Sequence, residues 1–376
     1  MRHLFYLILM LLISCKGKIG DTDLDYFSNL NFSLDTVIID PGDEIVFLKY
    51  QLSNSDISKD GKYLLNFNKD DHTVEKINLD ELRLEEKHSF EKEGPNGTGS
   101  YVGKLLAYNE NQIILTGMGR RELFSLDGQK LNSIHFKDFS LDGEPMSDGE
   151  LRLVRGLDTD TNRLYGIIYS DFDKSYTLGI LNLEDFKVSK LKLKSFEKLS
   201  DYEIMFSSNG IQIYYPPNID LDCFGTKVIL SNEITNSLTW YDTEKDSLFI
   251  RSYDSQLTAN HKEKDYKREH GTFEELEAEQ RRLKEEINFL PPLWDPDNQI
   301  FYRFSYQELA VENRGGESMK SKVYLTVLDK NLNQIGESLV PQLTKEPGKH
   351  FVKDGKIWIY ENMDDEMGFI RLEMDE

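Results

Sequence analysis

The chain has 376 residues but only two cysteines, Cys15 and Cys223. If Cys15 carries a lipid, as argued below, no pair is left for an intrachain disulfide. No paired-cysteine spacing points to structural zinc either. We expect Cys223 to pack as a small apolar residue in the core.

The sequence also lacks the short motifs of common active sites. It has no H-E-x-x-H and no G-x-S-x-G, and Gly103-Lys104 is followed by Leu105 instead of the Ser or Thr of a phosphate-binding loop. Most histidines of the body lie in charged, turn-like contexts, so we expect most of them to be solvated. Catalysis stays open, because a propeller can assemble acids and histidines from several blades.

The chain has fewer positively charged than negatively charged side chains. The chain has 45 Lys and Arg against 67 Asp and Glu, a formal net charge of −22. An acidic surface repels phosphate backbones, so no nucleic-acid partner is expected.

Long apolar runs are missing after the first, which extends from Leu4 to Ile13 behind Arg2 and His3. That run is shorter than the roughly 20 residues of a membrane span and matches the core of a secretory signal, about 7–15 residues. Leu12-Ile13-Ser14-Cys15 follows, which resembles the bacterial lipobox. The resemblance implies a signal peptide over 1–14 and lipid on Cys15, with the membrane as partner. An ordinary signal peptide or a buried N-terminal helix are the alternatives.

The polar segment 15–26 predicts a lipidated tether, and 27–376 a folded domain. Lys16 is not the aspartate that often signals inner-membrane retention in enteric bacteria, which favours the outer membrane. Whether the domain faces the periplasm or the outside stays open.

What the body does contain is β pattern. Short runs rich in Val, Ile, Tyr, Phe and Leu alternate with polar residues and are separated by Asp, Asn and Gly turns. Examples are 63–67, 73–79, 112–117, 163–169, 176–183, 211–215, 247–253, 299–306, 322–328 and 356–360.

A weak repeat of strand, Asp- or Asn-containing turn and strand is typical of four-stranded propeller blades. Its spacing predicts an all-β, six-bladed β-propeller. The last blade is short, and 31–40 would supply its outer strand and close the ring. A pair of two-sheet sandwiches is the alternative. The predicted blades start near residues 53, 100, 150, 203, 289 and 348.

One insertion near 272–289 breaks the β pattern. Thr272 and Glu275 form a capping box, and apolar residues follow at helical spacing until Pro291-Pro292 ends the helix. The helix either packs on the ring or serves as an arm that binds a partner or gates a site.

Taken with the lipobox, four segments resemble a family of Gram-negative bacterial lipoproteins that carries the label of a domain of unknown function. They are "FSLDTVIIDPGDEI", "SDISKDGKYLLNFNKDDHTVEKINLDEL", "FEKEGPNGTGSYVG" and "EEINFLPPLWDPDNQIFYRFSY". The resemblance implies a six-bladed propeller in the cell envelope and brings no catalytic residues.

The glycine-rich stretch 90–104 is the main candidate for a site. It predicts a crossing from the outer strand of one blade to the inner strand of the next, which either only turns the chain or also lines a central pocket. Tyr214, Tyr215 and Tyr302 are further candidates, more typical of core. The residues assigned to a pocket lining are Gly94, Pro95, Asn96, Gly97, Gly99, Tyr101, Trp294 and Arg303.

No metal ligand and no cofactor is assigned. The segment 158–162 begins like a calcium loop, but Arg163 stands where glycine is needed and Tyr169 where glutamate is needed, so a hairpin turn is favoured. Calcium stays open as the one candidate ion. Asp220, Asp222, Asp295 and Asp297 are similar weak hints.

The favoured function is a non-enzymatic binding or scaffolding module of the cell envelope, with an envelope protein or a glycan as partner. The alternative is a lactonase-like hydrolase or lyase that uses a central carboxylate cluster or calcium. A third hypothesis is a sensor or assembly factor whose 272–289 helix contacts a membrane partner.

Overall fold

The computed structural model describes residues 30–374, apart from 118–119, 142–143, 146–150, 159–161, 171–173, 264 and 310–319. The predicted signal peptide, Cys15 and the predicted tether lie outside the described residues. The described chain is all-β, as predicted, with a single α-helix. That helix is neither long nor apolar enough to cross a bilayer.

Six antiparallel sheets of four strands make up the body. The first contains β2 (Ser55–Ile57), β3 (Tyr63–Asn68), β4 (Thr73–Asn78) and β5 (Arg83–Ser89). The second contains β6 (Lys104–Asn109), β7 (Gln112–Gly117), β8 (Arg120–Ser125) and β9 (Lys130–Ile134). The third contains β12 (Leu151–Asp158), β13 (Arg163–Ser170), β14 (Ser175–Asn182) and β15 (Val188–Lys192).

The fourth sheet contains β18 (Ile219–Phe224), β19 (Lys227–Asn232), β20 (Ser237–Asp242) and β21 (Ser247–Ser252). The fifth contains β23 (Asn288–Asp295), β24 (Ile300–Glu308), β25 (Ser321–Asp329) and β26 (Gln334–Leu339). The sixth contains β27 (His350–Lys353), β28 (Lys356–Met363) and β29 (Glu366–Met374), completed by β1 (Phe32–Ile38). β1 pairs with β29 from Phe32↔Met374 to Ile38↔Gly368, so an N-terminal strand completes the last sheet, as expected.

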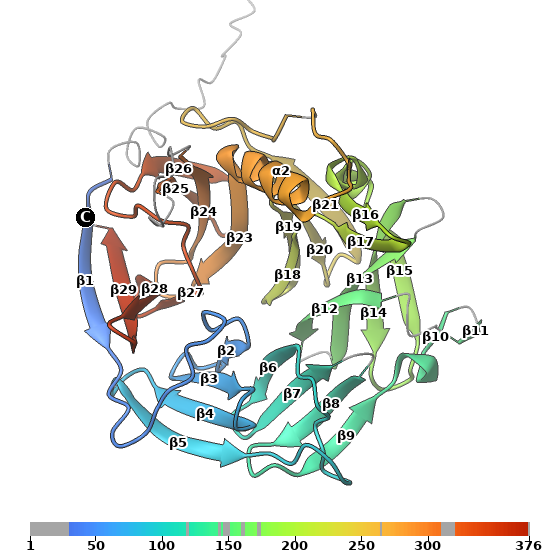
Figure 1. Ribbon diagram of the computed structural model, residues 1–376, viewed down its shortest axis with the longest axis vertical. Coiled ribbons are helices and arrows are strands. Elements are labelled where there is room, and N and C mark those ends of the chain that lie inside the picture. The colour runs from blue at the N-terminus through green and yellow to red at the C-terminus, as the bar shows by residue number, and fades with distance from the viewer. Residues whose placement is uncertain are drawn as a thin grey trace, which may run out of the picture.

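The sheets lie around a central space, with the first strand of each nearest the centre and the last at the rim (Figure 1). The core consists of apolar clusters between neighbouring sheets. One of them joins the sixth sheet to the first through Trp358, Phe369, Leu64 and Ile77. Similar clusters lie between each of the other pairs of neighbouring sheets, so packing continues around the propeller-like arrangement.

The Asp and Asn residues of the repeat act at the strand ends. Asn68 Oδ1 accepts from the Asp70 backbone N–H at 2.9 Å, and Asp295 Oδ1 accepts from that of Asp297 at 3.0 Å. Such side-chain bonds mimic a backbone turn and reverse the chain between strands. The turns between strands are thus built as the repeat predicts.

The predicted start of the fourth sheet near 203 is wrong. Residues there form a separate sheet of β16 (Ile204–Ser208), β17 (Ile211–Tyr215) and β22 (Glu269–His270), in which β22 runs parallel to β16. Pro216 and Pro217 follow β17 and have no N–H to continue a ladder, so the fourth sheet begins only at Ile219.

The inserted helix is α2 (Phe273–Glu285). Thr272 Oγ1 accepts from the Glu275 N–H at 3.2 Å, while the Glu275 carboxylate accepts from the N–H of Gly271, one residue before the expected one. The Asn288 amide donates to the carbonyls of Lys284 and Glu286 and closes the C-terminal end.

The helix thus ends before the predicted residue 289, and the prolines do not end it. Pro291 and Pro292 lie inside β23, at an irregularity between Phe289 and Pro292 in its pairing with β24. Bulges of this kind are where strands tolerate proline. Short elements complete the fold: β10 (Ser140–Leu141), β11 (Glu144–Pro145) and the 3-10 turns Phe136–Asp138, Lys194–Phe196 and Leu199–Tyr202.

Candidate functional site

The connections between consecutive sheets start and end on one face of the ring, here called the crossing face. Five of the sheets have four antiparallel strands in chain order, and in the sixth β1 follows β27, β28 and β29 as the outer antiparallel strand. In every sheet the inner strand therefore starts and the outer strand ends on the same side. The segment 90–103 links outer β5 to inner β6, as predicted, and α2 belongs to the connection between β21 and β23 (Figure 1).

The first part of the 90–103 crossing is tied to the second sheet. The Gly97 N–H donates to the Gly94 carbonyl at 3.0 Å and closes a turn around Pro95 and Asn96. Asn96 Oδ1 accepts from the Lys130 N–H at 3.2 Å, and the Gly97 carbonyl accepts from Lys130 Nζ at 2.8 Å. These hydrogen bonds fix the path of residues 94–97.

Two glycines are required here, Gly97 by space and Gly99 by its backbone conformation. A Cβ on Gly97 would lie 2.7 Å from the Glu93 carbonyl carbon, closer than real Cβ atoms approach backbone. Gly99 has φ +82° and its Cβ would fall on the Arg120 guanidinium. The glycine-rich part of the stretch therefore shapes the crossing.

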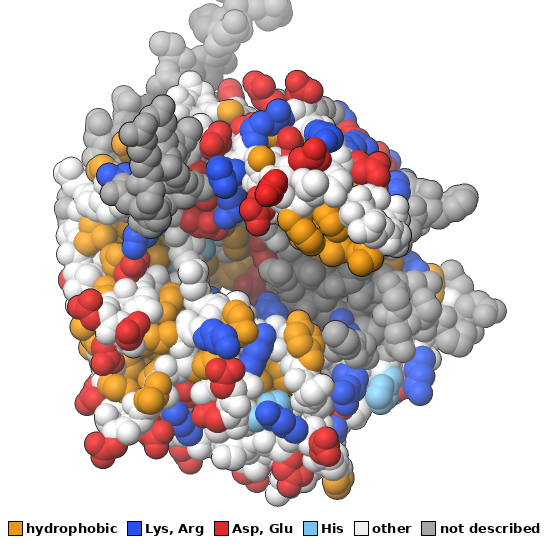
Figure 2. Space-filling model, viewed as in Figure 1, with side chains coloured by type: hydrophobic (Ala, Val, Ile, Leu, Met, Phe, Trp, Pro, Cys, Tyr) orange, Lys and Arg blue, Asp and Glu red, His pale blue; other side chains and the backbone are white. Residues whose placement is uncertain are grey.

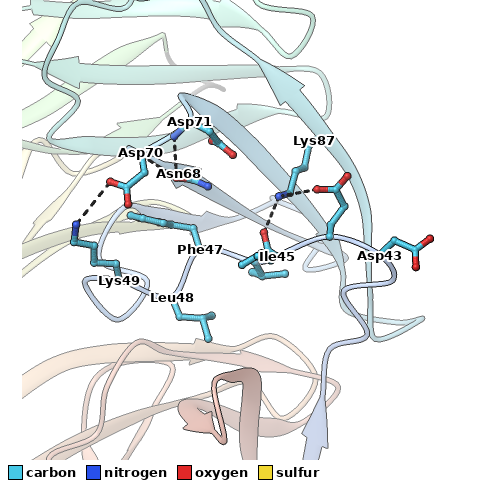
Figure 3. A pocket seen from close by; sticks show the side chains of 11 residues that line it. Asp43, Ile45, Phe47, Leu48, Lys49, Asn68, Asp70, Asp71 and Lys87 are labelled. Atoms are coloured by element: carbon cyan, nitrogen blue, oxygen red, sulfur yellow. Dashed lines mark hydrogen bonds and ion pairs between the residues drawn. The ribbon is translucent and has the colours of Figure 1, made fainter.

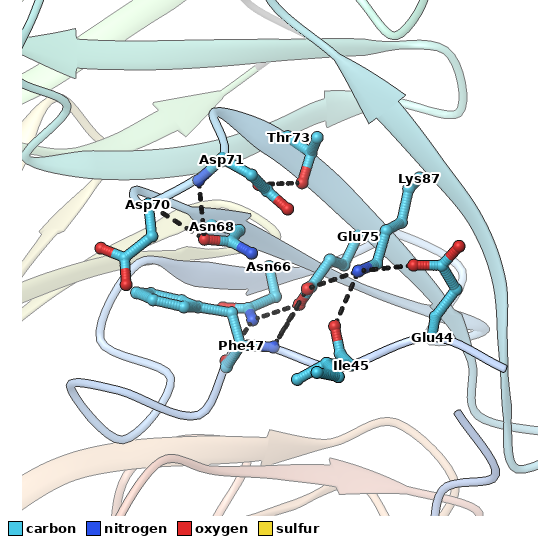
Figure 4. Close-up of polar contacts among 10 residues, drawn as sticks. All are labelled: Glu44, Ile45, Phe47, Asn66, Asn68, Asp70, Asp71, Thr73, Glu75 and Lys87. Atoms are coloured by element: carbon cyan, nitrogen blue, oxygen red, sulfur yellow. Dashed lines mark hydrogen bonds and ion pairs between the residues drawn. The ribbon is translucent and has the colours of Figure 1, made fainter. Parts of the chain in front are cut away.

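The chain that precedes β2 forms a second crossing, residues 41–54, here called the strap. It runs from outer β1 of the sixth sheet to inner β2 of the first. The Phe47 N–H donates to Glu75 Oε1 at 3.0 Å, and the Phe47 carbonyl accepts from Asn66 Nδ2 at 2.8 Å (Figure 4). Lys87 Nζ donates to the Ile45 carbonyl at 2.7 Å.

Asn66, Glu75 and Lys87 come from three neighbouring strands in one row. Asn66 pairs with Glu75 across β3 and β4, and Glu75 pairs with Lys87 across β4 and β5. Side chains at paired positions point to the same face of a sheet. The first sheet thus presents one donor amide, one carboxylate and one ammonium that hold the strap in place.

Glu75 is the centre of this row and is 0% exposed. Burial raises the pKa of its carboxyl, and the bonds from Asn66 and the Phe47 N–H together with the charge of Lys87, 3.7 Å away, oppose that rise. A buried carboxylate is tolerated only when such partners replace its water. The strap is therefore part of the environment that Glu75 needs.

The strap contains a left-handed turn made without glycine. Tyr50, Gln51 and Leu52 have φ of 67°, 50° and 58°. Each such residue costs about 1–2 kcal/mol because Cβ approaches the following carbonyl oxygen. Leu52 is buried in the core between the sixth and first sheets, which helps to hold the turn in place.

The turn places Tyr50 beside Lys69 and Tyr101, here called the tyrosine–lysine cluster. Lys69 Nζ lies 5.0 Å from the Tyr50 ring centroid and 5.6 Å from that of Tyr101. With its amide oriented to satisfy both neighbours, Asn54 donates to the Gly103 carbonyl at 2.6 Å and accepts from Lys69 at 2.8 Å. Partial burial lowers the pKa of Lys69.

Both tyrosine rings remain half open to solvent, with 54% of Tyr50 and 50% of Tyr101 exposed. Packing alone does not account for a strained turn that displays an aromatic side chain. Backbone strain of this kind persists where the surrounding structure imposes it and is concentrated at binding sites.

A pocket of about 750 Å³ lies between the strap and the first sheet (Figure 3). Strap residues 43–49 form one wall, and Asn68, Asp70, Asp71 and Lys87 form the other. Lys49 pairs with Asp70 at 3.8 Å. The pocket therefore has charged walls of both signs, and its lining residues Lys49 and Asp70 are chain neighbours of Tyr50 and Lys69.

A second group of charges lies at the central channel. In the space-filling view the crossing face is hollowed at its centre, where acidic and basic side chains meet (Figure 2). Asp222 on inner β18 is open to this channel but enclosed by the inner strands. That enclosure raises its pKa to about 6, with Asp56 adding to the rise and Lys104 and Lys349 opposing it.

Three other residues predicted for a pocket pack in or against the core, whereas Tyr214, for which core was also favoured, is 49% exposed. Arg303 is 2% exposed between the fourth and fifth sheets. It donates to the Leu290 and Thr235 carbonyls and to Asn236, and burial lowers its pKa to about 10. Trp294 packs against Phe301, and Tyr302 is buried. These three residues therefore have a packing role, which is the role that the sequence pattern favoured.

The structure holds no ligand, and residues 159–161 of the calcium-like segment lie outside its description. Within the described ranges, no three His, Cys, Asp or Glu side chains are placed to hold a metal ion. A smaller pocket of about 180 Å³ includes Glu233 and Glu346. Asn218 donates to Glu233, and Lys284 pairs with Glu346 at 3.2 Å.

Two smaller expectations had mixed outcomes. The prediction that the histidines are solvated is wrong for His72 and His270, which are buried. His72 Nε2 contacts Thr98 Oγ1 and thereby joins the 90–103 crossing to the β3–β4 turn. Cys223 is half-buried against the core between the third and fourth sheets, and this burial raises its thiol pKa. Of the predicted pocket residues, only Tyr101 lies in the tyrosine–lysine cluster.

The sequence analysis missed Tyr50, Lys69 and Glu75. A signal was present for Tyr50, because it lies just before an inner strand, as Tyr101 does before β6. Glu75 had none, since a charged residue at an alternating position of a strand predicts exposure to solvent.

Comparison with solved structures supports the fold. A solved structure of a Bacteroides vulgatus protein, 14% identical in sequence, matches with a TM-score of 0.67. The match covers 93% of this chain and 99% of that protein's chain. A Bacteroides fragilis protein whose given name marks it as exported, 10% identical, has a TM-score of 0.53 over 92% and 96%. No functionally curated protein matches the chain.

The sequence profile of one family matches residues 28–339, which is most of the chain. Its description is a domain of unknown function, and the solved Bacteroides vulgatus structure belongs to the same family. This protein is a member of the DUF4221 family.

Proposed function

We propose that this protein is a lipid-anchored, non-enzymatic binding module of the cell envelope. In this proposal the six sheets are the blades of a closed propeller. Lipid on Cys15 holds the domain at the outer membrane of a Gram-negative bacterium, and the crossing face carries the binding site. Support comes from the lipobox resemblance, the packing of every sheet on its neighbours and the exported relative.

The single observation that carries the binding site is the tyrosine–lysine cluster on its strained turn. Three consecutive left-handed residues hold Tyr50 half exposed opposite Tyr101, with a fixed ammonium between the rings. Rigid aromatic side chains supply contact area at low entropic cost, because few torsions need to be fixed on binding.

The chemistry favours an acidic glycan as ligand. The face of an aromatic ring carries partial negative charge, so the C–H groups of a sugar ring pack well against it. Lys69 offers an ammonium for a carboxylate or sulfate group on the sugar. Such a basic point on a chain with net charge −22 selects an anionic ligand locally rather than over the whole surface.

Calorimetric titration of the detergent-purified full-length chain with oligogalacturonate and hyaluronan fragments tests this site, with neutral dextran fragments as reference. We expect the acidic fragments alone to bind, with an affinity at least about tenfold lower in Tyr50→Ala, Tyr101→Ala and Lys69→Met. Tyr214→Ala removes a tyrosine of matched exposure, 49%, from another sheet and should leave binding unchanged. Equal binding of neutral and acidic fragments would refute the proposal.

The anchor is tested separately. Cys15→Ser should move the protein from the membrane fraction to the soluble fraction and abolish labelling with a radioactive fatty acid. Retention of label in this variant would show that another residue carries the lipid.

Asp222 favours a second candidate, the hydrolase or lyase. A carboxyl with a pKa of about 6 next to the charge of Asp56 is suited to general acid–base catalysis. Lactone and glycan turnover by the purified chain, lost in Asp222→Asn, would establish this candidate. Absence of turnover in both chains would leave the binding function.

A further inference from the structure

The three-stranded sheet of β16, β17 and β22 presents an unusual edge. In the part of the chain that the structure describes, β17 pairs only with β16, so its other side is free. Figure 2 shows hydrophobic side chains gathered beside α2, where this sheet lies. Ile211 and Ile213 of β17 are 58% and 38% exposed, and Phe273 of α2 stacks on Phe206 at 4.2 Å and is also exposed.

Edges elsewhere in the molecule carry charge. Each outermost strand of the six sheets contains at least one charged residue, and so does each innermost strand. Charged side chains on an edge discourage pairing with another strand. Examples on the outermost strands are Asp35, Glu85, Lys130, Lys190, Arg251 and Glu337.

The β17 edge has no such protection. Residues 204–219 contain no charged side chain, in a chain of which 30% is charged. The strand Ile-Gln-Ile-Tyr-Tyr also has high β-propensity and no bulge in its pairing with β16. Among described edge strands of three or more residues, β17 alone lacks a charge.

We infer that this edge pairs with the same edge of a second copy of the chain. Antiparallel pairing about a two-fold axis at Ile213 sets Ile213 opposite Ile213, Gln212 opposite Tyr214 and Ile211 opposite Tyr215. All of these pairs are compatible, and none brings like charges together. The two three-stranded sheets become one sheet of six strands.

Charge argues for this occupant and this place. Two copies with net charge −22 repel each other, so they can associate only where the contact is locally uncharged and self-complementary. On the apolar face of the sheet, Ile204 and Phe206 of β16 pack in one cluster with Leu276 of α2. Ile211 and Ile213 continue this face beyond the helix, and a second copy covers them.

Cysteine cross-linking in isolated membranes tests the pairing on the full-length chain. Antiparallel partners lie about 4.5–5.5 Å apart between Cα atoms, within the range of a disulfide. With a mild oxidant, Ile213→Cys should run mainly as a disulfide dimer on a non-reducing gel. Ile250→Cys, at an isoleucine of β21 that is more exposed than Ile213 (54% against 38%), should stay monomeric. A dimer band no stronger at 213 than at 250 overturns the inference.

Two further variants fix the register and the charge argument. Ile211→Cys combined with Tyr215→Cys should cross-link more than either single variant, since the two positions face each other. A photoreactive group placed at Gln212, whose chemistry does not involve lysine, should cross-link two copies of the chain. Adding Ile213→Lys should abolish this cross-linking while the melting temperature stays unchanged. Raising the salt concentration should strengthen dimerisation, because it screens the repulsion of the acidic copies. Dimerisation that persists in Ile213→Lys overturns the inference as well.

Discussion

The two crossings that flank the first sheet solve one problem with different residues. Both lead from an outer strand to an inner strand on the crossing face, and both end near a half-exposed tyrosine of the cluster. The 90–103 crossing uses glycines where space and backbone geometry demand them, at Gly97 and Gly99. The strap uses Tyr50, Gln51 and Leu52 in left-handed conformation and is held by the buried Glu75.

The difference separates a crossing whose turns are made by glycine from one whose turn stores backbone strain. Glycine-based turns cost the folded state little steric energy, while the strap turn must be held by contacts elsewhere. In the strap those contacts are the Glu75 row and the buried Leu52. The comparison therefore predicts which substitutions loosen the strap and which distort the glycine-rich crossing.

The largest effect is expected from Glu75→Ala. It removes the acceptor of the Phe47 N–H and a charge partner of Lys87, which leaves buried polar groups without partners, and should lower the free energy of unfolding by about 3–5 kcal/mol. Urea denaturation measures this. Glu81→Ala, at a surface carboxylate paired with Arg83, should change stability by less than about 1 kcal/mol. Similar losses in both variants would show that the strap is not held by Glu75.

Gly97→Ala should come next. Its Cβ would clash with the Glu93 backbone, and overpacking of this kind costs about 1–3 kcal/mol. Gly271→Ala, at a glycine whose added Cβ meets nothing within 4 Å, is the matched control and should be neutral. An unchanged melting temperature for Gly97→Ala would mean that the crossing can shift to admit a side chain.

Gln51→Gly should have the opposite sign. Glycine adopts φ of 50° without steric cost, so we expect the folded state to gain up to about 1 kcal/mol. Gln334→Gly in strand β26 should instead lose roughly 0.5–1 kcal/mol. A loss at both positions in urea denaturation would contradict the strain assigned to the strap.

The smallest effect concerns pH. The folded pKa of Asp222 is about 6, above the ordinary 3.8, so the folded state holds more protons than the unfolded state between these values. Stability contributed by this group is therefore present at pH 4 and lost as pH rises through 6. Asp222→Asn should flatten that part of the stability profile; an identical profile in both chains would place Asp222 in open solvent.

The fold followed from the sequence where pattern and period carry it. Turn residues at strand ends predicted strands and crossings, and the sequence 31–40 predicted the completing strand. The prediction that the β16–β17 segment starts a blade was wrong because its alternation of apolar and polar residues is equally suited to a sheet outside the ring. Only the pairing with the distant β22 decides its place. The role of Glu75 was not predicted, because its partners come from the strap and from neighbouring strands, and no local sequence pattern indicates them.

The most direct test of the binding account is the affinity of Gln51→Gly for acidic oligosaccharide, measured by calorimetry beside its stability. If the strained turn holds Tyr50 ready for a ligand, the variant should be more stable yet bind about fivefold more weakly, since ordering the freed turn costs about 1 kcal/mol on binding. Greater stability with unchanged affinity would show that the strain does not serve binding.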